Sequence, residues 1–286
     1  MLNFALKSGF YSIGKLISCF SKQTSYQKDL ELSHKKAAMI EFKIVYFPVL
    51  KSTNHYLSEL LSAGNEIDGL CVRAGFQEVG KGQGQNSWHS EDGKNLLLSL
   101  GFDFSYLKAE QQFSITQMAS LAVLEVLKTF LPKAKLAVKW PNDLFVGDKK
   151  IGGMLISNTV NGKHLERTII GLGINLNQVI FPEAIDRPVS VMQLSGNLIN
   201  VESFEQKMLH SFAKQVEFLK TDKGREILAM SYLSQLYAFD QWRLYQLSEK
   251  KVTLKITGIG EFGFLLMEDQ HGQTFSFDMK EVAFLF

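Results

Sequence analysis

Apolar residues follow two different periods along this chain. Continuous or alternating apolar runs, which are typical of strands, lie at positions 41–49, 70–76, 95–104, 136–138, 144–146 and 167–177. Apolar residues at helical spacing begin just after residue 55, extend from 110 to 131, and return at 204–216 and 227–237. The helical stripe at 110–131 is expected to bury against a sheet.

The last part of the chain has a different pattern. Beyond Trp242, short alternating segments at Leu247, 251–258, 262–267 and 273–277 are separated by Glu-Lys, Gly-Glu and His-Gly turns. Short strands at this spacing predict a small β-barrel of five strands.

A tight hairpin is predicted at 139–153, which reads KWPNDLFVGDKKIGG. Pro141 has no amide hydrogen to give to a sheet, so it ends the preceding strand. Asn142 and Asp143 favour a turn through side-chain hydrogen bonds. Gly147-Asp148 is a two-residue hairpin signal, after which the chain returns.

The returning strand carries Lys149 and Lys150 toward Gly152-Gly153. Side chains alternate along a strand, so only one of the two lysines can face inward. The hairpin then presents an amide, a carboxylate and one ammonium beside backbone bared by glycines. The alternative is an ordinary surface hairpin whose polar pairs only make turns.

Three hydrogen-bonding residues, Ser52, Thr53 and Asn54, stand just before a short helical pattern. One of them is expected to cap the helix. The other two leave spare polar groups near free helix amides, where a polar ligand can bind. Capping alone remains the simpler interpretation.

A glycine-rich loop, Gly80-Lys81-Gly82-Gln83-Gly84-Gln85, follows the strand that ends at Gln77. Alternating glycines let backbone amides approach an anion, and Lys81 adds positive charge. No Gly-Lys-Ser/Thr opens a helix, which excludes a P-loop, and no helical pattern follows, which excludes a dinucleotide fingerprint. A mobile surface loop is the alternative. Trp88 argues against it, because a large aromatic residue in a polar loop usually packs on something, and an adenine face is one candidate.

Gly171 and Gly173 lie two apart on one face of a predicted strand, and Asn175 and Asn177 continue that face. Such a pair leaves a smooth patch for a ligand or a neighbouring backbone. Glycines that only accommodate a bulky neighbour explain the pattern equally well.

The composition is that of a globular protein, with 45% hydrophobic and 21% charged residues among 286. The net charge is +2, of which residues 1–38 contribute +4 and the remainder −2. This distribution argues against a nucleic-acid partner for the main body. Cys19 and Cys71 form no disulfide framework or metal spacing, and fit a reduced, intracellular setting.

The beginning of the chain allows two interpretations. The first 28 residues contain no acidic residue, as in organelle-targeting peptides, but they also lack arginine. We favour an extension at 1–38, poorly ordered, with the folded part starting near Met39. No apolar run reaches 18 residues, so no membrane span is expected.

Taken in order, these stretches resemble biotin protein ligases of the monofunctional type, over roughly residues 42–286. The resemblance rests on Lys51-Ser52-Thr53-Asn54, on Gln77 with the glycine loop through Trp88, on KWPND with Lys150 and Gly152-Gly153, and on GLGINLN at 171–177. It implies an α+β fold, a mixed sheet with helices akin to class II aminoacyl-tRNA synthetases, followed by an SH3-like barrel. The catalytic domain would span 39–239 and the barrel 240–286.

The resemblance also implies a reaction in two steps. Biotin and MgATP give biotinyl-5′-adenylate and pyrophosphate, and a lysine of a biotin carboxyl carrier protein then attacks the adenylate. The residues expected to contact biotin are Ser52, Thr53, Asn54, Gln77, Lys81, Gly82, Gln83 and Lys150. Those expected to hold the nucleotide are Trp88, Asn142, Asp143 and Asn175, with Asp143 also placing Mg²⁺.

Lys150 is the expected catalytic residue. Adenylation brings together two anions, the biotin carboxylate and the α-phosphate, and a fixed ammonium between them offsets their repulsion. The loop departs from the family pattern, because many members read Gly-Arg-Gly-Arg-Arg-Gly where this chain has Gly80 to Gln85. Lysine and glutamine lack the bidentate grip of arginine on phosphate, so looser retention of the adenylate is predicted.

Two other functions remain open from the sequence. A lipoate-type ligase uses the same fold and adenylate chemistry, but the KWPND hairpin and the missing Arg-Arg-x-x-Gly-Gly-Gly stretch disfavour it. A non-catalytic biotin or nucleotide sensor is the second alternative. We expect a cytoplasmic protein that binds no DNA, because no winged-helix pattern precedes the first strand. The sequence does not predict the oligomeric state.

Overall fold

Seven strands form the larger of two sheets, in the order β1-β2-β3-β7-β6-β5-β4. They are β1 (Lys43–Leu50), β2 (Leu70–Gln77), β3 (Leu96–Asp103), β4 (Leu136–Lys139), β5 (Asp143–Val146), β6 (Lys149–Asn161) and β7 (His164–Ile174). β1 and β2 pair in parallel, and each other neighbouring pair is antiparallel. This computed structural model describes residues 40–84 and 86–286, so the predicted extension at 1–38 lies outside the described residues.

The helices lie at the segments with helical spacing, apart from a short one at 191–195 that the sequence pattern did not predict. They are α2 (Thr53–Ser62), α3 (Phe113–Phe130), the short α4 (Val191–Ser195), α5 (Val201–Val216) and α6 (Asp222–Ser234), with 3₁₀ turns η1 (Ala109–Gln111), η2 (Glu217–Lys220) and η3 (Glu261–Gly263). Within the described residues, no helix has the length and apolar character needed to cross a membrane.

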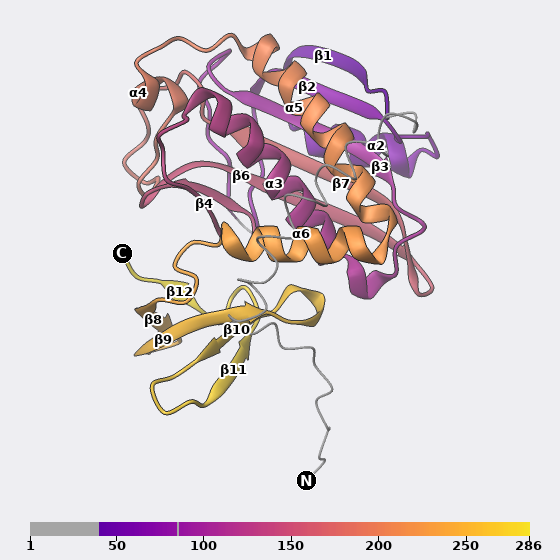
Figure 1. Cartoon of the computed structure of the whole chain (residues 1–286). Coiled ribbons are helices and arrows are strands. Elements are labelled where there is room, and N and C mark those ends of the chain that lie inside the picture. The colour runs from indigo at the N-terminus through magenta and orange to yellow at the C-terminus, as the bar shows by residue number, and fades with distance from the viewer. Residues whose placement is uncertain (1–39, 85) are drawn as a thin grey trace. The chain divides into compact units, whose positions relative to one another are not determined.

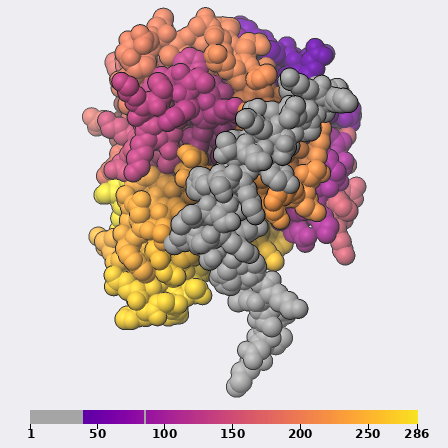
Figure 2. Space-filling model, in the orientation of Figure 1, coloured from indigo at the N-terminus to yellow at the C-terminus, as the bar shows by residue number. Residues whose placement is uncertain are grey.

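The two faces of the large sheet are covered differently. On one face, Leu57 of α2 is buried against Ile67, Val72 and Ile169. On the other face, α3 and α5 lie side by side, as Figures 1 and 2 show, and Phe212 of α5 stacks on Phe102 of β3. This second face is therefore filled by core side chains, whereas α2 covers only part of the first.

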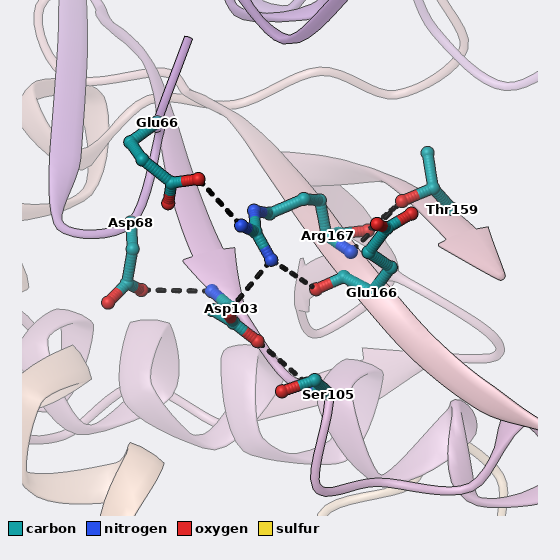
Figure 3. A network of polar contacts seen from close by, with 7 residues as sticks. All are labelled: Glu66, Asp68, Asp103, Ser105, Thr159, Glu166 and Arg167. Carbon is teal, nitrogen blue, oxygen red and sulfur yellow. Dashed lines mark hydrogen bonds and ion pairs between the residues drawn. The ribbon is translucent and has the colours of Figure 1, made fainter. Parts of the chain in front are cut away.

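An ion-pair network joins β7 to the end of β3 and to the segment before β2. Arg167 donates to Asp103 at 2.8 Å and to Glu66 at 2.7 Å, and Asp68 accepts a bond from the Asp103 amide (Figure 3). Burial alone would raise the pKa of the Asp103 carboxyl. Hydrogen bonds from Ser105 and the charge of Arg167 outweigh burial, so this pKa lies below its ordinary value.

Five C-terminal strands, the number that was predicted, form a second, antiparallel sheet in the order β11-β10-β9-β8-β12. They are β8 (Trp242–Leu247), β9 (Lys250–Ile259), β10 (Leu265–Glu268), β11 (Thr274–Phe277) and β12 (Ala283–Phe284). The Trp140 indole donates to the carbonyl of Gly263 at 2.9 Å and so ties this sheet to the hairpin. Residues 40–286 form one compact unit, and a domain boundary between 239 and 240 stays a prediction.

Candidate active site

A cavity of about 140 Å³ lies on the α2 face of the large sheet. Its walls come from the start of α2, the end of β2, the glycine loop, the β5–β6 hairpin and the middle of β7. Eleven of the twelve predicted site residues line it: Ser52, Thr53, Asn54, Gln77, Lys81, Gly82, Gln83, Trp88, Asn142, Asp143 and Lys150. Segments up to about 120 residues apart in the sequence therefore meet at one place.

The inner end of the cavity is built on the first turn of α2. Ser52 is the N-cap, accepting a bond from the amide of His55. The Gln77 amide oxygen accepts bonds from the Thr53 amide at 2.8 Å and from the Thr53 hydroxyl at 3.1 Å. Ser52 and Thr53 are almost fully buried. Capping thus explains Ser52, while the remaining polar groups are held in place at the wall of the cavity.

Ser99 also belongs to this end, although no motif in the sequence predicted it. Its hydroxyl lies 2.8 Å from that of Thr53, and the residue is completely buried in β3. The signal in the sequence was a single serine within the apolar run Leu96 to Phe102.

The two glycines of β7 accommodate side chains from other elements. A Cβ on Gly171 would lie 2.8 Å from the Asn54 amide nitrogen, and one on Gly173 would lie 2.4 Å from Cε2 of Trp88. The smooth patch predicted from the sequence therefore receives Asn54 and the Trp88 indole. The indole N–H is buried without a hydrogen-bond partner among the described residues, so it remains a donor for a ligand.

A β-bulge determines which lysine of the hairpin faces the cavity. Leu144 pairs with Gly152 but Phe145 pairs with Lys150, so Ile151 is the extra residue in β6. Without this extra residue, strict alternation from Gly153 would direct Ile151 into the cavity and Lys150 away from it. Ile151 is instead fully buried and Lys150 lines the cavity. This confirms that only one lysine faces inward, since Lys149 is exposed.

Lys150 lies between an anion and an aromatic ring. Its ammonium is 2.5 Å from Oδ1 of Asp143 and 5.9 Å from the centre of the Trp88 ring. The side chains of Lys150 and Asp143 are 31% and 27% exposed, so both remain accessible from the cavity. Asn142 is fixed by a bond of 2.6 Å to the carbonyl of Met154. The hairpin thus holds a cation, a carboxylate and an amide around one point.

The glycine loop folds back on itself beside the hairpin. The amide of Gly82 donates to Asn86 and that of Trp88 donates to Gly80, at 2.8 and 2.9 Å. A Cβ on Gly80 would lie 2.3 Å from the Trp88 carbonyl oxygen, so this close approach requires glycine. At the tip, the Gln83 amide lies within hydrogen-bond distance of the Met279 sulfur. The loop is therefore held at its base and at its tip, while Lys81 stays exposed.

Asn175 is the predicted site residue that the structure does not bring to the cavity. It lies just past the end of β7, is buried, and donates its side-chain amide to the Val189 carbonyl at 3.1 Å. Val191 also donates its amide to the Asn175 carbonyl. Asn175 therefore holds the segment before α4 against the sheet, and a direct contact with nucleotide stays a prediction.

The side chains that line the cavity suit a metal ion that arrives bound to a substrate better than one that the protein holds by itself. Among residues 40–84 and 86–286, no group of three or more His, Cys, Asp or Glu side chains is arranged to hold a metal ion. Among the described residues that line the cavity, Asp143 is the one carboxylate. Mg²⁺ is commonly held by one or two carboxylates together with substrate phosphates, and Asp143 fits that role.

Comparisons with known proteins agree with this geometry. The model of the biotin/lipoate A/B protein ligase family matches residues 46–175. The bifunctional ligase/repressor BirA of Bacillus spizizenii is 30% identical over 236 residues, covering 80% of this chain and 70% of that protein. The biotin–protein ligase of Homo sapiens is 28% identical over 249 residues, covering 80% of this chain and 32% of that protein.

Among solved structures, the biotin protein ligase from Aquifex aeolicus in complex with biotin and ATP has the same fold. The TM-score is 0.68 at 23% identity, and the match covers 84% of this chain and 97% of that one. The predicted α+β fold with a mixed sheet and a second small sheet is confirmed. With its sequence relatives and its fold in agreement, the chain belongs to the biotin protein ligase family.

Proposed function

We propose that this chain is an ATP-dependent biotin–protein ligase that makes biotinyl-5′-adenylate and transfers biotin to a lysine of a biotin carboxyl carrier domain. The observation that carries the proposal is the position of Lys150, beside Asp143 and Trp88 in the cavity. Two anions react more readily when a fixed positive charge offsets their repulsion, and the Lys150 ammonium on the hairpin can supply that charge.

The inner end of the cavity suits the ring system of biotin. The cyclic urea of biotin has two N–H donors and one carbonyl acceptor. Ser52, Thr53, Asn54 and Gln77 line this end and offer hydroxyl and amide groups that can complement all three. Binding there directs the carboxylate of biotin outward, toward Lys150 and the hairpin.

The outer part suits the nucleotide. The Trp88 indole supplies an aromatic face. The Asn142 side-chain nitrogen donates to Met154, and its oxygen accepts no hydrogen bond from the described residues. Lys81 and the backbone of Gly82 lie in the loop on the same side. Asp143 would accompany Mg²⁺ on the phosphates.

In the first step, a carboxylate oxygen of biotin attacks the α-phosphorus of ATP, and the bond to the leaving pyrophosphate breaks. Both reactants are anions, so the developing negative charge on the α-phosphoryl oxygens is the main barrier. Lys150 is positioned to neutralise that charge, because it can exchange Asp143 for the phosphate within the cavity. In the second step, the amine of the carrier lysine attacks the biotinyl carbonyl carbon, AMP leaves, and the amine loses a proton.

The test incubates the chain with biotin, ATP and a purified biotin carboxyl carrier domain, and transfer is measured from the mass of the carrier domain. The expected result is the mass increase of one biotin, only when ATP is present. A parallel arm with lipoate and a lipoyl domain identifies the lipoate-type activity if it is the faster one. Biotin binding without biotin-dependent exchange of pyrophosphate into ATP would instead identify a sensor.

A further inference from the structure

A second group of cations lies on the cavity face of the hairpin, beyond Lys150. Lys139 pairs with Asp143 across β4 and β5, and Phe145 pairs with Lys150 across β5 and β6. Residues that pair directly lie on the same face of a sheet, as do residues two apart on one strand. All four side chains therefore project from the face that carries the cavity.

Aromatic rings surround the Lys139 ammonium. It lies 5.5 Å from the ring centre of Phe145, 5.2 Å from that of Phe284 and 5.5 Å from that of Phe286. Burial, together with the charge of Lys150, lowers the pKa of Lys139, and Asp143 and Asp186 oppose this shift. No carboxylate of the described residues lies within ion-pair distance of this ammonium. Lys139 is thus held by aromatic faces, with its charge still available to an anion.

Arg187 reaches the same place from the segment between β7 and α4. Its carbonyl accepts the amide of Lys150 at 2.8 Å, and the Lys150 carbonyl accepts the amide of Val189 at 2.9 Å. Its φ angle is +46°, in the left-handed region that a residue with a side chain rarely adopts. Strained backbone persists where neighbouring contacts over-determine it, commonly at functional sites.

Phe286 contacts both cations. The Arg187 guanidinium lies 4.8 Å from the centre of its ring, and the ring stacks on Phe145 with centroids 5.8 Å apart and planes 7° from parallel. One aromatic side chain that follows the second sheet thus contacts both a lysine and an arginine beside the proposed catalytic lysine.

We propose that Phe286 is a positioning residue, which holds Lys139 and Arg187 as a cation pair that binds the pyrophosphate end of ATP. This inference rests on the proposed function and extends its site past Lys150. Lys139 and Arg187 lie 5.5 and 4.8 Å from the centre of the same ring, so removing the ring releases both side chains at once. Binding of a polyanion should therefore depend on an uncharged side chain that never touches it.

The test is calorimetric titration of inorganic pyrophosphate into the full chain with biotin present. Phe286→Ala is expected to weaken pyrophosphate binding about tenfold, because Lys139 and Arg187 then lose the ring that fixes their positions before the anion binds. Phe286→Tyr, which keeps the ring, should bind within about twofold of the original chain. Phe277→Ala is the matched control, because among the described residues Phe277 stacks only on Phe275, within the second sheet, and its loss should leave binding unchanged. Biotin affinity should stay the same in all three variants.

Unchanged pyrophosphate affinity in Phe286→Ala would overturn the proposal, and so would failure of the unaltered chain to bind pyrophosphate. An equal loss of biotin affinity would show general damage to the fold and would also overturn it. In biotin-dependent exchange of pyrophosphate into ATP, the expected change is a higher KM for ATP with little change in kcat. Absence of exchange in the unaltered chain would refute the ligase function alone, because the binding comparison needs no turnover.

Discussion

Replacing Gly173 by alanine adds a single methyl group at the closest contact of the site. That methyl would lie 2.4, 2.7 and 2.8 Å from three carbons of the Trp88 indole. β7 pairs at this residue with Leu97 on one side and Gly153 on the other, so its backbone cannot retreat. The indole must move instead, and forcing extra volume into a packed contact costs about 1–3 kcal/mol.

The expected result of Gly173→Ala is a free energy of unfolding lower by about 2 kcal/mol, with a melting temperature lower by roughly 4–8 °C. In a Trp88→Ala background the methyl has no indole to displace, so the same substitution should cost less than about 0.5 kcal/mol. Urea unfolding of the four proteins of this cycle measures the coupling. If the indole also supports the nucleotide, ATP affinity falls about tenfold in Gly173→Ala, whereas biotin affinity is kept.

Gly258→Ala is the control for glycine replacement in a strand. Among the residues that the structure describes, a Cβ there would meet only Leu266, at 3.8 Å, which is an ordinary contact. The expected change in stability is within about 0.5 kcal/mol. An equal cost of Gly173→Ala with and without Trp88 would refute the reasoning, because the cost would then not arise from the indole.

Two further predictions concern the loop and the ion-pair network. The single cation Lys81 and the glutamine at 83 should release biotinyl-adenylate faster than arginine-rich family members do, and stopped-flow measurement of a release rate as slow as theirs would contradict this. Arg167→Met should lower stability at pH 7 by about 1 kcal/mol. The pKa of Asp103 is lowered in the fold, so its contribution is present at neutral pH and is lost as the pH falls below about 4. The stability difference should therefore shrink in acid unfolding curves below pH 4, and a constant difference would count against the ion pair.

Local patterns predicted most of the elements, because their causes are local. Pro141 and Gly147-Asp148 determine the hairpin by backbone chemistry, and the apolar stripe of α3 follows from its spacing. The predicted strand at 167–177 is β7, which begins three residues earlier and ends at Ile174. It ends there because the chain turns to place Asn175 under the segment before α4, which is a tertiary contact.

The site required information that no local pattern holds. The sequence predicted that one of two lysines faces inward, but the choice depends on the bulge at Ile151 and so on how β6 pairs with β5. Ser99 joins the site because β3 lies under the first turn of α2. The arrangement of Phe286 over Lys139 and Arg187 joins positions about 100 to 150 residues apart, which only the fold brings together.

The most direct test of the central claim compares Lys150→Ala with Lys149→Ala in biotin-dependent exchange of pyrophosphate into ATP. Lys149 is the exposed neighbour on the same strand, so it controls for the loss of a charge on the hairpin. Lys150→Ala is expected to lower the exchange rate by about 10²–10³-fold while the protein stays folded, and Lys149→Ala to stay within about twofold of the original rate. A near-normal rate in folded Lys150→Ala would contradict the central claim.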